Sequence, residues 1–131
     1  MTVRILTEAD RENTLRLLDR EHEINLFMIY DIITYGIQNL GHLFQGDYYG
    51  VFRGPELCGV SCLYNFGSLW IYSPVQDLTD ELAGHMAGVK LTPRYLIAPK
   101  DWAVSLLEKL EKRGVKPENL EEQEYICLLY T

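Results

Sequence analysis

The sequence predicts a domain of mixed helix and strand (α/β in the broad sense, of the α+β type). Helices are expected to flank a mixed, mainly antiparallel central sheet. Three observations predict this class. Apolar residues in the middle of the chain alternate with a period of two, the segments on either side show helical spacing, and turn residues separate the segments. No internal repeat or low-complexity linker divides the 131 residues. Residues 1–131 are therefore expected to form a single domain with a modest core.

The first third of the chain predicts one strand and two helices. Val3 to Leu6 has the character of a short strand, and Thr7 to Asp10 has the form of a capping box that opens a helix ending near Arg20. Asn25 is expected to cap a second, more buried helix, which Gly36 closes in a left-handed conformation.

The middle of the chain predicts three strands. Tyr48 to Phe52 is rich in strand formers, and Arg53 to Glu56 is a turn. Cys58 to Tyr64 then alternates, with its two cysteines, Val60 and Tyr64 on one face. A second turn leads into a strand from Leu69 to Tyr72. Consecutive strands joined by short turns form an antiparallel meander.

The last third alternates helix and strand again. A short helix is expected around Leu82, a strand from Arg94 to Ala98, an amphipathic helix between Asp101 and Gly114, and a final strand from Tyr125 to Tyr130. The resulting order is β-α-α-β-β-β-α-β-α-β, which favours a mixed sheet with helices on its faces.

The charge of the chain excludes some classes of partner. Lys and Arg number 12 against 19 Asp and Glu, for a net charge of −7, and the basic residues are scattered singly. Binding to nucleic acid needs clustered cations, and an anionic membrane surface would repel this chain. We therefore expect neither partner. The longest apolar stretch, Leu26 to Ile33, contains Asp31 and is shorter than the roughly 20 residues of a membrane span. It is expected to form a buried helix.

The expected compartment is the cytoplasm. Arg4 is followed by only two apolar residues before a polar run, which does not fit a secretory leader. The three cysteines Cys58, Cys62 and Cys127 lie inside apolar runs, which indicates reduced thiols that pack as small hydrophobic groups. The histidines have no metal-ligand spacing, so no metal site is expected.

Three segments carry a resemblance to a known family. They are Asn25 to Ile32 with Tyr35 and Gly36, then Leu69 to Pro74, and finally Glu124 to Leu129. Together with the order of elements, they resemble the GNAT acetyltransferase superfamily, and in particular the divergent N-terminal half of bacterial two-part GNAT proteins. The resemblance implies that the full protein transfers an acetyl group from acetyl-CoA to an amine. It also implies that this domain packs against a C-terminal catalytic GNAT domain.

The acetyl-CoA loop of that family is degenerate here. GNAT enzymes carry Gln/Arg-x-x-Gly-x-Gly/Ala after the fourth strand, where small residues let backbone N–H groups approach the pyrophosphate. The matching stretch runs from Gln76 to Glu81, and only Gln76 fits, because Thr79 and Glu81 stand where small residues belong. Asp77, Asp80 and Glu81 would each repel a pyrophosphate by about 1 kcal/mol or more at contact distance. No cofactor is expected for this domain alone.

The general acid of the family is also missing. Its tyrosine precedes a Gly-Phe pair at the end of the fourth helix, and Leu107 stands in the corresponding place. We therefore expect no catalytic residue in this chain. Two alternatives stay open. One is a complete small GNAT enzyme that still holds CoA in a V-shaped gap after Trp70 to Tyr72. The other is a module that forms a homodimer through an exposed aromatic face or an edge strand.

Two weaker catalytic patterns have simpler explanations. Gly59 to Leu63 begins like a hydrolase elbow, but the second glycine is missing and Ser61 lies in the middle of a predicted strand. Glu21, Glu23 and Asp31 include potential general bases, yet on so acidic a chain they are better explained as a solvated helix end and a loop partner.

Aromatic residues crowd the three central strands. They are Tyr48, Tyr49, Phe52, Tyr64, Phe66, Trp70 and Tyr72. If part of this set is exposed, it would suit docking of a second domain or closure over a flat apolar ligand; the alternative is a core covered by helices. Four residues are assigned to substrate binding or domain docking: Asp31, Tyr49, Trp70 and Tyr72.

Overall fold

The computed structural model describes residues 1–74, 78–89, 95–98 and 100–114. In chain order the elements are β1 (Thr2–Ile5), a 3-10 turn (Glu8–Asp10), α1 (Arg11–Leu18), a 3-10 turn (Asp19–Glu21), α2 (Leu26–Tyr35), β2 (Gly46–Arg53), β3 (Glu56–Tyr64), β4 (Ser68–Tyr72), α3 (Thr79–Val89), β5 (Tyr95–Ile97) and α4 (Lys100–Lys112). The predicted class and the order of these elements are confirmed. The strand expected over Tyr125 to Tyr130 lies outside the described residues.

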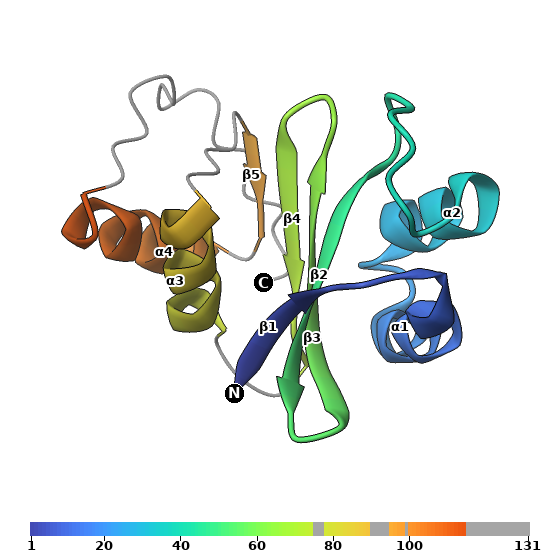
Figure 1. The fold of residues 1–131 in the computed structure, drawn as a ribbon, viewed down its shortest axis with the longest axis horizontal. Helices are drawn as coiled ribbons and strands as arrows, with labels where there is room; N and C mark the ends of the chain where they lie inside the picture. Colours follow the sequence, from blue (N-terminus) through green and yellow to red (C-terminus); the bar gives the residue numbers. More distant parts are fainter. Residues whose placement is uncertain (75–77, 90–94, 99, 115–131) are drawn as a thin grey trace.

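The five strands form one sheet in the order β1-β2-β3-β4-β5. The first four are antiparallel to their neighbours, whereas β4 and β5 run parallel. Helices α1 and α2 cover one face of this sheet, and α3 and α4 cover the other (Figure 1). The parallel pair follows from chain direction, because α3 carries the chain back before β5 begins.

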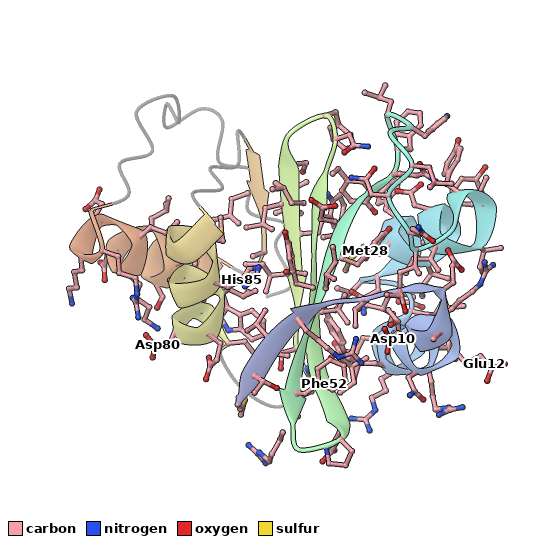
Figure 2. All side chains as sticks on the ribbon, viewed as in Figure 1. Asp10, Glu12, Met28, Phe52, Asp80 and His85 are labelled. Carbon is pink, nitrogen blue, oxygen red and sulfur yellow. The ribbon has the colours of Figure 1, made fainter. Side chains whose placement is uncertain are left out.

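Each face of the sheet has its own core, as the two-residue period requires. Side chains that face α1 and α2 include Tyr48, Val60, Cys62, Tyr64, Trp70 and Tyr72, whereas Val51, Leu69 and Ile71 face α3 and α4. Met28 of α2 lies against the first core and is almost fully buried (Figure 2). Val60 and Tyr64 therefore share one face, as predicted.

Strand β3 contains a bulge next to its first cysteine. Val51 pairs with Gly59 but Phe52 pairs with Leu57, so Cys58 has no directly opposite residue. Cys58 and Cys62 are buried free thiols, as predicted, and Cys127 lies outside the described residues. Ser61 is paired on both sides within the sheet, which confirms its place inside a strand.

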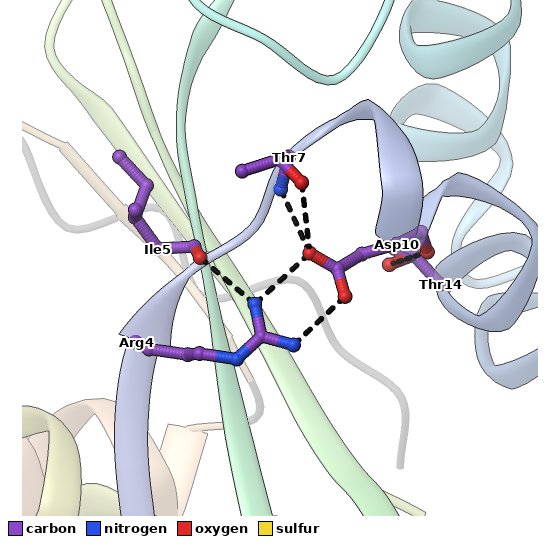
Figure 3. Close-up of polar contacts among 5 residues, drawn as sticks. All are labelled: Arg4, Ile5, Thr7, Asp10 and Thr14. Atoms are coloured by element: carbon purple, nitrogen blue, oxygen red, sulfur yellow. Dashed lines mark hydrogen bonds and ion pairs between the residues drawn. The ribbon is translucent and has the colours of Figure 1, made fainter.

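A polar cluster joins β1 to the start of α1 (Figure 3). The Asp10 carboxylate accepts from the Thr7 N–H at 2.9 Å, and the expected capping box forms. The Arg4 guanidinium donates to both oxygens of Asp10, at 2.8 and 2.9 Å. Because of these hydrogen bonds, chiefly the one from Arg4, the pKa of Asp10 falls from 3.8 to about 2.

Two expectations about α2 were wrong. Only Met28 and Ile32 of this helix are buried, so it is not a buried helix. The reason is that the sheet meets a single stripe of α2, at positions four residues apart. Asn25 does occupy the residue before the helix, but it does not cap it. Its side-chain amide instead donates to the Leu18 carbonyl at 3.0 Å and ties the two helices together.

Candidate functional site: a ring-lined pocket around Asp31

The site begins with a stripe along α2. Phe27, Asp31 and Tyr35 are spaced four residues apart, which places them on one face of the helix, one above another. This stripe lies next to the buried positions Met28 and Ile32, so its side chains lie at the edge of the interface between α2 and the sheet, beside solvent. Phe27 is 63% exposed and Asp31 is half-buried.

Ring contacts continue from this stripe across the sheet and back to it. Phe27 lies 5.7 Å from Trp70 of β4, and Trp70 lies 6.4 Å from Tyr64 of β3, measured between ring centres. Tyr64 stacks on Phe66 at 5.2 Å, in the turn that follows β3. From there the rings return to α2.

Phe44, in the loop between α2 and β2, closes the series. Its ring centre lies 6.1 Å from Phe66 and 5.8 Å from Tyr35. The arc of rings therefore starts and ends on α2, with Asp31 midway between its two ends on the same helical face. We call these rings, together with Tyr30 and Asp31, the ring-lined pocket.

The ring-lined pocket is an open cavity of about 270 Å³. Its lining consists of Phe27, Tyr30, Asp31, Tyr35, Phe44, Tyr64, Phe66 and Trp70. Asp31 is the one charged residue in this described lining. Among the described residues, no serine, cysteine, lysine or histidine belongs to the lining, so this part of the pocket offers binding surfaces and one carboxylate rather than a nucleophile.

Hydrogen bonds hold the loop that carries Phe44. Gln45 is buried, and its side-chain oxygen accepts from the N–H groups of Leu40 and His42 at 3.0 and 3.1 Å. Its amide nitrogen donates to the Tyr35 carbonyl at 2.7 Å. Asn65, at the turn after β3, donates to the His42 carbonyl at 2.7 Å. The wall formed by Phe44 is therefore fixed against both α2 and the β3–β4 turn.

The carboxylate sits in a poorly solvated place. Burial raises the pKa of Asp31 above its ordinary value, and a hydrogen bond from the Tyr64 hydroxyl opposes part of the rise. The Tyr48 hydroxyl donates in turn to the Tyr64 hydroxyl at 3.4 Å. Burial holds the pKa of both tyrosines above the ordinary value, so both hydroxyls are neutral. Within the described part of the chain, Asp31 forms no ion pair.

The structure separates the four residues that the sequence assigned to docking or substrate binding. Asp31 and Trp70 both line the ring-lined pocket. Tyr49 points to the other face of the sheet, where its ring lies 4.5 Å from the His85 ring of α3. Tyr72 is buried, and its hydroxyl donates to Glu21 at 2.9 Å.

Sequence reasoning missed much of the lining. It looked for exposed rings on the central strands, but of those seven aromatic residues only Phe66 is exposed, and the other six belong to a helix-covered core. The missed residues are Phe27, Tyr30, Tyr35 and Phe44. The spacing of Phe27, Asp31 and Tyr35 was the available signal.

The start of α3 contains part of the stretch for which the sequence predicted a degenerate acetyl-CoA loop. Gln76 and Asp77 lie outside the described residues, whereas Thr79 is buried and Glu81 is partly exposed in the first turn of α3. Lys109 of α4 donates to the Thr79 hydroxyl at 2.6 Å and lies 3.4 Å from Asp80. Lys109 is thus engaged by residues of α3 itself.

Comparisons with known proteins add no identification: no family model, no curated protein and no solved structure matches this chain. None of the helices in the described ranges is both long and apolar enough to cross a membrane. Nor do three or more potential metal-binding side chains come together in those ranges.

Proposed function

We propose that this chain is a GNAT-like domain of an acetyl-CoA-dependent N-acetyltransferase, itself without catalytic activity, that packs against a catalytic GNAT domain. The observation that carries the proposal is the topology. A strand and two helices precede an antiparallel meander, and the chain then crosses through α3 to a strand parallel to β4. This order of elements is the one by which the chain resembles the GNAT fold.

The start of α3 supports the non-catalytic part. In the GNAT family this helix start receives the pyrophosphate, where backbone N–H groups and the helix dipole favour negative charge. Here Asp80 and Glu81 occupy the first turn, and Lys109 is held by Thr79 and Asp80. Leu107, in the place of the catalytic tyrosine, packs against the core between the sheet, α3 and α4.

The outer side of α2 and the loop after it support the docking part. Six large apolar side chains of α2 and this loop are more than half exposed: Leu26, Phe27, Tyr30, Ile33, Leu40 and Leu43. Apolar side chains gathered on one side of a domain are typical of a surface that another protein covers. A catalytic GNAT domain is the occupant that the topology favours.

One observation favours the second candidate, a complete small GNAT enzyme. Strand β5 pairs with Ser68, Leu69 and Trp70 of β4, but Ile71 and Tyr72 have no β5 partner among the described residues. The described pairing of the two parallel strands thus ends at Trp70, in the region where a GNAT enzyme holds CoA between these strands. This candidate requires that acetyl-CoA binds despite the acidic start of α3.

Thermal unfolding with and without acetyl-CoA distinguishes the two candidates. A ligand at 100 times its dissociation constant stabilises a fold by about 2.7 kcal/mol. We expect no saturable stabilisation by acetyl-CoA, and a clear saturable one would refute the non-catalytic assignment in favour of the small enzyme. The double variant Asp80→Asn and Glu81→Gln is the matched control, because it removes the repelling charges without altering the size of the side chains.

The partner is tested separately. We expect a catalytic GNAT domain to be encoded in the same reading frame or in a neighbouring gene, and to form a complex with residues 1–131. The variant Ile33→Glu should weaken that complex, whereas Glu12→Gln, on an exposed position of α1, should not. Self-association of the isolated chain in light scattering, abolished by Ile33→Glu, would instead identify this surface as a homodimer interface.

A further inference from the structure

We propose that the ring-lined pocket binds a quaternary ammonium group, with ring faces around the cation and Asp31 as its counter-ion. The inference rests on the geometry of the pocket and is independent of the proposed acetyltransferase role. The proposed ligand class is an alkylated cation, and the ring-lined pocket is separate from the start of α3, where the family holds CoA.

The walls have the composition that such a cation requires. Aromatic faces attract a cation that lies within about 6 Å of the ring centre, and quaternary ammonium groups are bound in this way because they carry little hydration. Here the successive rings from Phe27 through Trp70 and Phe66 to Tyr35 form an arc in which neighbouring ring centres are 5.2 to 6.4 Å apart. A cation bound in this pocket would therefore lie among aromatic side chains.

The negative charge of Asp31 is complementary to the positive charge of a quaternary ammonium group. Asp31 is half-buried on the face of α2 between the two ends of the arc, without an ion-pair partner in the described part of the chain. A carboxylate in apolar surroundings is unfavourable unless a cation accompanies it. The net charge of −7 adds a favourable long-range attraction for a cationic ligand.

The pocket favours a quaternary over a primary ammonium. A primary ammonium has three N–H donors, each of which needs an acceptor when it leaves water. The described lining offers aromatic rings and one carboxylate, to which the Tyr64 hydroxyl is already turned, and its remaining oxygen acceptors are the hydroxyls of Tyr30 and Tyr35. A trimethylammonium group has no donor to satisfy.

The size favours a headgroup. The cavity of about 270 Å³ is below the roughly 300 to 1,000 Å³ of sites for drug-sized molecules. The pocket is also open, so a substituent on the ammonium nitrogen can extend into solvent. Choline is therefore a suitable probe.

The experiment compares choline with its neutral carbon isostere, 3,3-dimethylbutan-1-ol, by calorimetric titration of the chain. The two probes have the same shape and differ in charge. We expect choline to bind at least about tenfold more tightly, since cation–π contacts with a desolvated cation are strong enough to give a factor of ten, which corresponds to about 1.4 kcal/mol. Ethanolamine, the primary amine of the same length, should bind more weakly than choline.

Variants locate the site. Asp31→Asn should weaken choline binding about tenfold or more while leaving the affinity for the neutral isostere unchanged, because it removes the charge and keeps the shape. Glu12→Gln removes an equal charge from an exposed position outside the pocket and should leave choline binding unchanged. Phe27→Leu keeps an apolar side chain but loses the ring, and should weaken choline more than the isostere.

Three results would overturn the proposal. Equal affinity for choline and the isostere would identify an apolar pocket without selectivity for charge. Unchanged choline binding in Asp31→Asn would place the cation elsewhere on the acidic surface. Absence of choline binding in the correctly folded chain, verified by its unfolding transition, would refute it outright. None of these outcomes depends on acetyl-CoA, so the proposal fails or stands apart from the acetyltransferase assignment.

Discussion

Replacing Asp10 by Asn should destabilise the fold at neutral pH by about 1 kcal/mol. The pKa of Asp10 falls from 3.8 to about 2 on folding, chiefly through the two hydrogen bonds from Arg4. A shift of about 1.8 units corresponds to at most about 2.4 kcal/mol at 1.36 kcal/mol per unit. Arg4 is 51% exposed, so solvent screening reduces that figure to about 1 kcal/mol.

The pH dependence of this effect has a definite sign. Because folding lowers the pKa of Asp10, its ionised form stabilises the native state fully above the unfolded pKa near 3.8. That stabilisation is lost as the pH falls through about 2. The difference between the original chain and Asp10→Asn should therefore shrink between about pH 4 and pH 2.

Urea denaturation across this pH range measures the difference, with Glu12→Gln as a control that removes a carboxylate without removing an ion pair. High salt should reduce the effect of Asp10→Asn, since screening weakens exposed pairs. A destabilisation at neutral pH no larger than that of Glu12→Gln would refute the reasoning. So would a difference that stays constant down to about pH 2.

Two substitutions and one labelling experiment test the packing further. Gly59→Ala should destabilise the fold by about 1–3 kcal/mol, because the added Cβ would collide with Leu78 and lie 3.2 Å from the Tyr72 carbonyl oxygen. Gly84 lies in a helix, and a Cβ added there would have nothing within 4 Å, so Gly84→Ala should stabilise the fold by about 0.5–1 kcal/mol. Urea denaturation measures the free energy of unfolding of both glycine variants. Equal changes in the two variants would contradict the account. Cys62 is fully buried and the pKa of its thiol is raised, so iodoacetamide should alkylate it only after unfolding. Peptide mass spectrometry locates the label. Rapid labelling of Cys62 in the native chain would contradict its buried position.

The order of elements was predictable because each depends on local pattern. The alternation from Val60 to Tyr64 and the helical spacing of Leu106 and Leu110 are visible in a short window, and both side-chain faces are found as expected. The burial of α2 was not predictable in the same way. An apolar run reports that a helix is hydrophobic, but the neighbouring elements determine how many of its sides are covered.

The ring-lined pocket was harder to predict, since it forms from four separate segments. Phe44 reaches Phe66 because Gln45 folds the intervening loop against α2, and such a loop leaves no periodic signal. The sequence did mark Asp31 and Trp70 as candidates, and both line the pocket. Tyr49 lies apart because neighbouring strand residues such as Tyr48 and Tyr49 point to opposite faces. Tyr72 shares the sheet face of Trp70, but it is buried and its hydroxyl donates to Glu21.

The most direct test of the central claim, that the rings around Asp31 form a site for an alkylated cation, is a nuclear Overhauser measurement on the chain with choline. The account predicts contacts from the choline methyl protons to the ring protons of Phe27, Phe44 and Trp70, lost in Asp31→Asn. Contacts to the ring of Tyr49 on the opposite face, or none at a choline concentration that saturates the calorimetric signal, would contradict it.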